Sequence, residues 1–260
     1  MATATAGTSS TTQPLAASFA SFQSAIVHFQ NATETRPYTY QFLPLQPVPQ
    51  SELSTVSLDN FERILKGMWS TTSGNTSQMV ELTATTDKDY AEAFNLFKLP
   101  GGTLHKIFRV QNATLFLQYM TEKRKMDQIY ATQTASSVSH EHFLYHGTNR
   151  TNVDNINANG FDRSYSGAAH GTALGNGTYF ARDIAYSAGY STVDTSSGHK
   201  FLYVARVLVG RFCQGFSGMQ HLPNQKTGIP FDCAVNVTTP SVFVIFRDIR
   251  AYPTYLYEFS

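Results

Sequence analysis

The sequence predicts an α+β domain with a β-rich C-terminal half, preceded by an N-terminal extension of different composition. Three observations predict it. After residue 140, short runs of β-branched and aromatic residues are separated by glycine-rich turns. Between residues 87 and 127, two segments carry apolar residues at helical spacing. The first 33 residues contain no charged side chain, and the composition changes near Met68.

Composition excludes several classes of protein. The 260 residues carry a formal net charge of +1, which argues against a non-specific nucleic-acid binder. A hydrophobic content of 42% is enough for a core, but no apolar run is long enough to span a membrane. Two cysteines, Cys213 and Cys233, exclude a disulfide framework. They could form one bridge, although a reduced intracellular chain is the simpler interpretation.

Two regions are expected, a flexible or weakly structured extension over residues 1–67 and a folded domain over residues 68–260. The extension is rich in Ala, Thr and Ser, and lacks the basic residues of a secretory or mitochondrial leader. Within it, residues 16–29 are apolar enough to dock as a short helix. Residues 36–51 hold four prolines and are interpreted as a linker.

The first part of the domain is expected to contain a strand at 79–83, a helix at 87–97, a strand at 105–110 and a helix at 114–127. The first helix carries Tyr90, Phe94 and Phe97 on one face, and a Pro-Gly-Gly sequence ends it. The second helix places Leu115, Tyr119 and Met126 near one side. Its basic run at 123–125 is expected to face solvent, and residues 130–140 to form a loop.

The C-terminal half is expected to hold strands at 143–146, 177–181, 201–209 and 241–246. Residues 152–159 predict a short helix with Val153 and Ile156 facing inward, followed by Gly160 in the left-handed conformation.

Common catalytic motifs are absent. The sequence has no phosphate-binding loop and no nucleophile elbow, and Gly175-Asn176-Gly177 leads into a strand instead of opening a helix. His140, His142 and His146 would share one face of a strand, which suits a metal. Because no cysteine or carboxylate pair lies near them in the sequence, no metal site is predicted.

The segment from Tyr145 to Ser191 is the strongest candidate site. Gly147 lacks a side chain, so a flat ligand can approach its N–H and C=O, and a carboxamide matches both groups. The glycine-rich residues 167–177 suit a loop that folds over a ligand. Ser187 and Tyr190 share a helical face, and with Tyr179 they could form a slot for a planar heteroaromatic ring. The alternative, that both tyrosines belong to the core, has equal weight on composition alone.

The chain from about Trp69 to its end resembles the catalytic domain of the poly(ADP-ribose) polymerase (PARP) family, the diphtheria-toxin-like ADP-ribosyltransferases. It is most similar to the mono-ADP-ribosylating branch found beside macrodomains. The resemblance rests on residues 144–148, 159–167, 175–181, 186–188, 198–200, 207–210 and 240–246, and upstream on 109–112 and 115–116. Phe116 stands where the family usually has Trp. The resemblance implies split antiparallel β-sheets with flanking short helices.

The resemblance also assigns roles around a bound NAD, the co-substrate, and calls for no metal. His146 would bind a ribose hydroxyl. Gly147 would hold the nicotinamide carboxamide through its backbone, assisted by the Ser187 hydroxyl. Tyr190 would stack on the nicotinamide ring, and Tyr179 would line the opposite wall.

Two further positions follow from the resemblance. Arg163 would contact NAD or the donor loop, and that loop, residues 164–176, would cover the adenosine half. The catalytic set would be His146, Tyr179 and Val242. Polymerising members carry Glu at the third position, whereas mono-transferring members usually carry Ile or Leu, so Val is a departure of similar type. Because Val cannot polarise an incoming ribose hydroxyl, transfer is expected to stop after one ADP-ribose.

The implied activity is NAD-dependent mono-ADP-ribosylation of protein acceptors, automodification included, with release of nicotinamide. A catalytically inactive module that binds NAD or a partner is one alternative. Modification of nucleic-acid ends is a second, disfavoured because positive charge is scattered. A secreted toxin-like transferase is a third, suggested by six N-x-[ST] sequons. With no leader signal, an intracellular location is expected, cytoplasmic or nuclear, with no membrane association.

Overall fold

The computed structural model describes residues 69, 77–85, 87, 89–131, 140–165 and 172–260. Contacts divide the chain into two units, Met1–Thr71 and Thr72–Ser260. The second unit is the one described below. The expected extension, with its docking helix at 16–29 and linker at 36–51, lies outside the described residues, as does most of the expected loop at 130–140. The expected boundary after residue 67 therefore stays a prediction.

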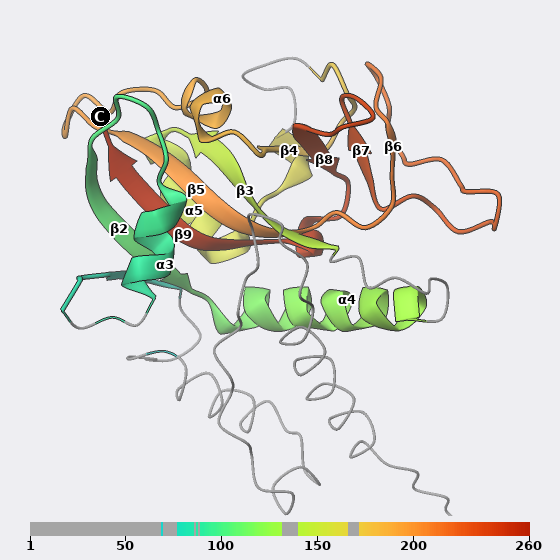
Figure 1. The fold of residues 1–260 in the computed structure, drawn as a ribbon, viewed down its shortest axis with the longest axis horizontal. Helices are drawn as coiled ribbons and strands as arrows, with labels where there is room; N and C mark the ends of the chain where they lie inside the picture. Colours follow the sequence, from blue (N-terminus) through green and yellow to red (C-terminus); the bar gives the residue numbers. More distant parts are fainter. Residues whose placement is uncertain (1–68, 70–76, 86, 88, 132–139, 166–171) are drawn as a thin grey trace, which may run out of the picture. The chain divides into compact units, whose positions relative to one another are not determined.

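The second unit is built on a nine-stranded sheet of order β1-β2-β9-β5-β3-β4-β8-β7-β6 (Figure 1). The strands are β1 (Gln78–Glu81), β2 (Leu104–Gln111), β3 (Glu141–Thr148), β4 (Thr178–Ala181), β5 (Lys200–Leu208), β6 (Phe212–Gln214), β7 (Cys233–Val235), β8 (Val242–Ile245) and β9 (Ala251–Phe259). The helices are α3 (Tyr90–Leu96), α4 (Ala113–Ala131), α5 (Arg150–Asn159) and α6 (Ile184–Ala188), with 3₁₀ turns at Arg163–Tyr165 and Asp248–Arg250. The predicted α+β class is confirmed. Among the described helices, none is both long and apolar enough to cross a membrane.

The sheet is narrowest between β3 and β4. These strands share one register pair, Tyr145 with Ala181, whereas β3 pairs with β5 along its whole length. The two halves of the sheet therefore separate immediately after Tyr145. This separation corresponds to the expected split of the sheet. One pair departs from the expected antiparallel arrangement. β6 and β7 are parallel, because residues 215–232 return the chain to the same end of the sheet.

The sequence did not indicate β9, which lies between β2 and β5 in the sheet. Almost all of its residues are buried, so it lacks the alternation of apolar and polar residues typical of a half-exposed strand. Pro253 also argues against a central strand, because proline donates no ladder hydrogen bond. The structure accommodates it at a register shift opposite Val204 and Ala205.

α3 buries a different face from the aromatic one that the sequence suggested. Ala93 and Leu96 are its buried residues, whereas Phe94 is half exposed and stacks on Tyr90. The small Ala93 lets the helix approach the sheet closely, and its carbonyl accepts a hydrogen bond from the hydroxyl of Tyr257. By contrast, α5 buries Val153 and Ile156 and ends at Gly160 with a φ of 79°, as predicted.

α4 packs against β9 and the Asp248–Arg250 turn. Tyr119 and Met126 are buried, as expected. Lys123 is also buried, so the prediction that the whole basic run faces solvent was wrong for this residue. Its ammonium group is neutralised by Asp127, whose carboxylate lies 2.9 Å away.

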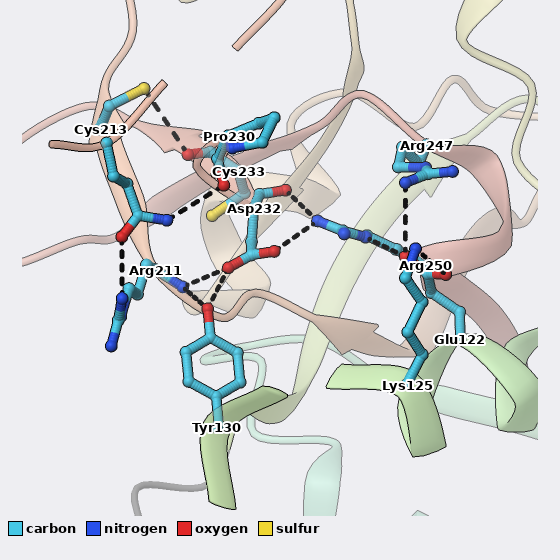
Figure 2. Close-up of polar contacts among 11 residues, drawn as sticks. Glu122, Lys125, Tyr130, Arg211, Cys213, Pro230, Asp232, Cys233, Arg247 and Arg250 are labelled. Atoms are coloured by element: carbon cyan, nitrogen blue, oxygen red, sulfur yellow. Dashed lines mark hydrogen bonds and ion pairs between the residues drawn. The ribbon is translucent and has the colours of Figure 1, made fainter. Parts of the chain in front are cut away.

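A buried ion cluster joins three parts of the unit that lie far apart in sequence (Figure 2). The Arg250 guanidinium donates from Nε to Glu122 on α4, and from Nη1 to the carbonyl and carboxylate of Asp232, each at 2.9 Å. Glu122 and Arg250 are almost inaccessible to water. Removing one partner from such a cluster leaves a buried charge uncompensated.

We expect Arg250→Ala to destabilise the protein by about 3–5 kcal/mol, because Glu122 and Asp232 would lose their shared cation. Arg247→Ala is the matched control. Its side chain is 53% exposed and lies 3.8 Å from Glu122, so a loss below about 1 kcal/mol is expected. Urea unfolding of both variants measures the difference. Equal destabilisation would contradict the role given to Arg250.

Candidate active site

The site begins where β3 continues past the end of its pairing with β4. The Ser187 hydroxyl donates to the Tyr145 carbonyl over 2.9 Å, so this carbonyl points away from β5 and toward α6. In an antiparallel strand, the N–H and C=O of one residue point to the same edge, and residues two apart share that edge. Gly147 therefore directs its N–H and C=O to the same edge as Tyr145, beyond the single residue pair that joins β3 to β4.

Only glycine fits at position 147. A Cβ built there would overlap the Ser187 carbonyl oxygen and come within 2.9 Å of Ser191 Oγ. The backbone of α6 thus lies directly against Gly147, where a side chain would project. A donor and an acceptor of one residue, both directed to the unpaired edge, form the arrangement that a primary carboxamide can match.

The hydrogen bond of His146 indicates which of its ring nitrogens carries the proton. Nδ1 lies 2.9 Å from the Tyr179 carbonyl, which can only accept, so Nδ1 carries the proton. Burial is the main effect on this ring, and it lowers the pKa of His146 below its ordinary value. The ring is therefore neutral near pH 7, and Nε2 presents a lone pair to an incoming hydroxyl. Edge contacts with the rings of Phe161 and Phe180, 5.1 and 5.5 Å between centroids, hold its orientation.

Helix α6 positions the remaining groups on this side. Asp183 caps its N-terminus by accepting from the N–H of Ala185. Ser187 is buried, and because its proton is used by the Tyr145 carbonyl, its oxygen remains available to accept from a ligand N–H. One turn later, Tyr190 is 38% exposed, which disfavours a core role for it.

Tyr190 is held in place by a second tyrosine, Tyr186, to which the sequence analysis assigned no role. The Tyr190 hydroxyl donates to the Tyr186 hydroxyl over 3.0 Å, and the ring centroids are 5.3 Å apart. This hydrogen bond is the main reason that the pKa of Tyr186 is raised to about 12. Tyr186 therefore stays neutral, and Tyr190 presents an aromatic surface on the α6 side of the site.

Tyr179 on β4 holds the C-terminal part of the predicted donor loop. Its hydroxyl accepts from the N–H of Leu174 and donates to the carbonyl of Gly175, each at 2.9 Å. Its backbone carbonyl is the partner of His146. One residue therefore connects the loop to the imidazole. Loop residues 166–171 lie outside the described residues.

Val242 lies one strand further along the sheet, on β8. It pairs with Ala181, and Ala181 pairs with Tyr145 across the narrow joint. Directly paired residues share a face, so Val242 and Tyr179 lie on the same face of the β4–β8 pair. Val242 is buried and places an aliphatic group there, which can neither accept nor donate a hydrogen bond.

Arg163 is not brought into this group. Its Nη1 donates to the Phe246 carbonyl over 2.9 Å, and the guanidinium lies 6.0 Å from the centre of the Phe246 ring. Its backbone N–H donates to Asp248. The predicted contact of Arg163 with NAD or the donor loop stays a prediction.

The three strand histidines have separate environments. His140 lies 3.1 Å from Asp127, and His142 stacks near Phe243, where burial lowers its pKa to about 4. Across the described residues, no group of three or more His, Cys, Asp or Glu side chains is arranged to hold a metal ion.

The sequence analysis did not predict two side-chain hydrogen bonds beside the site. Thr192 donates to the Asn149 side chain over 2.6 Å, which connects the segment after α6 to the start of α5. Ser191 donates to the Phe201 carbonyl, also over 2.6 Å. Both are single polar residues in loops, and no spacing pattern in the sequence marks them.

Comparison with known proteins agrees with this geometry. A family model described as the poly(ADP-ribose) polymerase catalytic domain matches residues 88–229. Human protein mono-ADP-ribosyltransferase PARP12 is 38% identical over 182 residues, which cover 68% of this chain and 25% of that protein. Human PARP14, of the same description, is 38% identical over 162 residues, 60% of this chain and 9% of its own length. Mouse PARP10, also a protein mono-ADP-ribosyltransferase, is 35% identical over 156 residues, 58% and 16% respectively.

The chain spans about a quarter or less of the length of these relatives. The matched region contains β2 to β5 and α6, and hence His146, Gly147, Tyr179, Ser187 and Tyr190. The chain belongs to the poly(ADP-ribose) polymerase catalytic domain family.

Proposed function

We propose that this protein transfers a single ADP-ribose from NAD to side chains of protein acceptors and releases nicotinamide. The observation that carries the proposal is the edge at Gly147, where a donor and an acceptor outside the β3–β4 pairing lie beside a neutral imidazole and an exposed aromatic ring. The relatives named protein mono-ADP-ribosyltransferase support the same reaction.

Each residue has a task that matches its environment. Gly147 binds the nicotinamide carboxamide through its N–H and C=O, and the Ser187 oxygen accepts from the carboxamide N–H₂. Tyr190 stacks on the nicotinamide ring. His146 accepts from a ribose hydroxyl at Nε2, because Nδ1 is already bound to Tyr179. When bound, NAD supplies the ADP-ribosyl group and a nicotinamide leaving group.

The absence of a carboxylate at position 242 limits the outcome to one transfer. Cleavage of the nicotinamide–ribose bond builds positive charge on the ribose, and Val242 offers no charge to stabilise it. An acceptor carboxylate can provide that stabilisation and act as the nucleophile. A ribose hydroxyl needs a base to lose its proton, and the aliphatic Val242 cannot be that base. Acidic protein side chains are therefore the acceptors that suit this site.

We also propose that the protein is intracellular. Cys213 and Cys233 are both free thiols, which agrees with a reducing compartment. Burial raises the pKa of both thiols, so neither is a reactive thiolate at neutral pH.

We expect Gly147→Ala to abolish NAD-dependent thermal stabilisation and automodification, because its methyl group would clash with the Ser187 carbonyl oxygen and displace α6, which carries Ser187. Gly189→Ala is the control, since Gly189 has helical φ and ψ values that alanine adopts readily. Differential scanning fluorimetry with NAD and intact mass analysis with labelled NAD measure the two effects. Normal NAD binding by Gly147→Ala would contradict the assignment of the carboxamide position.

We expect discrete mass increments of single ADP-ribose units for the wild-type protein, lost in His146→Ala. Val242→Ile should preserve them, because it keeps an aliphatic side chain at a buried position. Val242→Glu should not produce chains by itself, since the acceptor must also be positioned. Long heterogeneous ladders from the wild-type protein would refute single transfer. Stabilisation by NAD without any modification would favour an inactive NAD-binding module.

The low pKa of His146 predicts the acid limb of the pH profile. Because burial lowers this pKa below its ordinary value of 6.5, the imidazole stays neutral as the pH falls through 6.5. We therefore expect kcat/KM to be retained at pH 6.5 and lost only at lower pH, as Nε2 becomes protonated. Titration of the His146 ring by NMR, assigned with His146→Gln, measures the midpoint. A midpoint at or above 6.5 would contradict the neutral-ring assignment.

A further inference from the structure

A second cavity lies away from the active site, between α4, the segment from β6 to β7, and the turn that precedes β9. Its volume is about 380 Å³, within the range of small-molecule sites. None of His146, Gly147, Tyr179, Ser187 or Tyr190 lines it. The charged residues on its wall are Lys125, Arg163, Arg211, Arg247, Arg250 and a single carboxylate, Asp232.

Three of these cations already have carboxylate partners. Arg250 is bound by Glu122 and Asp232. Arg247 and Lys125 approach the same Glu122, at 3.8 and 4.0 Å, and both are about half exposed (Figure 2). Two carboxylates, Glu122 and Asp232, therefore serve these three cations, so the wall keeps excess positive charge.

Arg211 and Arg163 contribute most to this excess positive charge. The Arg211 guanidinium donates to the neutral amide oxygen of Gln225 at 2.9 Å, and the Arg163 guanidinium donates to the Phe246 carbonyl. Within the described part of the chain, neither guanidinium has a carboxylate oxygen at ion-pair distance. Asp248 accepts from the backbone N–H of Arg163 instead.

Arg211 is held in place before any ligand binds. Its backbone N–H donates to the Tyr130 hydroxyl at 3.0 Å and to Asp232 at 2.9 Å, and Tyr130 also donates to Asp232 (Figure 2). The guanidinium lies 5.3 Å from the centre of the Tyr130 ring. A planar, half-buried guanidinium with fixed orientation is the side chain best suited to bind a phosphate through two parallel hydrogen bonds.

The cavity also has an apolar surface. Met126 and Ile129 from α4, and Leu222, Ile229 and Phe231 from the opposite segment, form it, while Gln220 and His221 add polar groups to the wall. A bare phosphate would leave this surface uncovered, whereas a ligand that joins a phosphate to a flat apolar ring would use both parts. The volume is sufficient for one nucleotide unit.

We propose that this cavity binds a nucleotide-sized organic phosphate, with the phosphate on Arg211 and the base against the apolar wall. The site is separate from the proposed NAD site, and the proposal does not depend on transferase activity.

The test uses the full chain with labelled isoleucine and methionine methyl groups, because these report each site separately. Met126 and Ile229 line the cavity, whereas Ile184 is buried in α6 beside Ser187. Titration with ADP should shift the Met126 and Ile229 methyl signals saturably, whatever happens at Ile184. Adenosine and inorganic pyrophosphate, which each carry half of the ligand, should bind at least about tenfold more weakly, since each loses one set of contacts.

Arg211→Gln should weaken ADP binding at these methyl groups by about tenfold or more, and Arg211→Lys should do so to a smaller degree because it keeps the charge. Arg150→Gln removes the same charge from the exposed surface of α5 and should have no effect. Unchanged melting temperatures verify folding, since the polar contacts of Arg211 with Tyr130 and Asp232 are made by its backbone. Equal ADP binding by Arg211→Gln and wild type would overturn the proposal, as would pyrophosphate or adenosine binding as tightly as ADP.

Discussion

The separation of β3 from β4 after one shared residue pair is the constraint on which the site depends. A fully paired β3 would use the Gly147 N–H and C=O in the ladder, and no ligand could reach them. Because the pairing stops at Tyr145, that edge is open, and α6 lies against it with Ser187. On the β4 side, the His146 ring contacts the Tyr179 carbonyl, while its backbone pairs with Tyr203 on β5. Strand geometry therefore creates the binding edge and sets the tautomer of the histidine beside it.

The donor loop and the imidazole are coupled through Tyr179. Its hydroxyl accepts from Leu174 and donates to Gly175, while its carbonyl accepts from His146. A change in the loop can therefore reach the imidazole that we propose binds the ribose, through a single residue. Phe246 lies on the other side of this loop, where a Cβ on Gly175 would come within 2.7 Å of its ring. Phe246 also lines the cavity that contains Arg211, so the same ring contacts both the loop and that cavity.

Charge is distributed unevenly over the unit. The proposed NAD site contains hydroxyls, backbone groups, aromatic rings and a neutral imidazole, and Val242 on β8 is aliphatic and buried. Buried charges lie in other parts of the unit, where carboxylates balance them: Arg250 with Glu122 and Asp232, Lys123 with Asp127, and Arg109 with Asp89. A neutral site is consistent with a reaction in which the acceptor supplies the negative charge, whereas the ion cluster connects α4 to the end of the sheet.

The sequence by itself determined the α+β class, most strands, the α5 helix and the residue types of the site, because alternation, capping glycines and the His-Gly and Tyr-Ser patterns are local signals. It did not indicate β9, whose burial on both faces and Pro253 remove the local signal of a strand. It also placed Lys123 in solvent. Only the tertiary structure decided the ion cluster, since Glu122 and Arg250 are 128 residues apart in the chain. The neutral state of His146 and the hydrogen bond from Arg163 to Phe246 were decided there too, because burial and hydrogen-bond partners come from segments that meet only when the chain is folded.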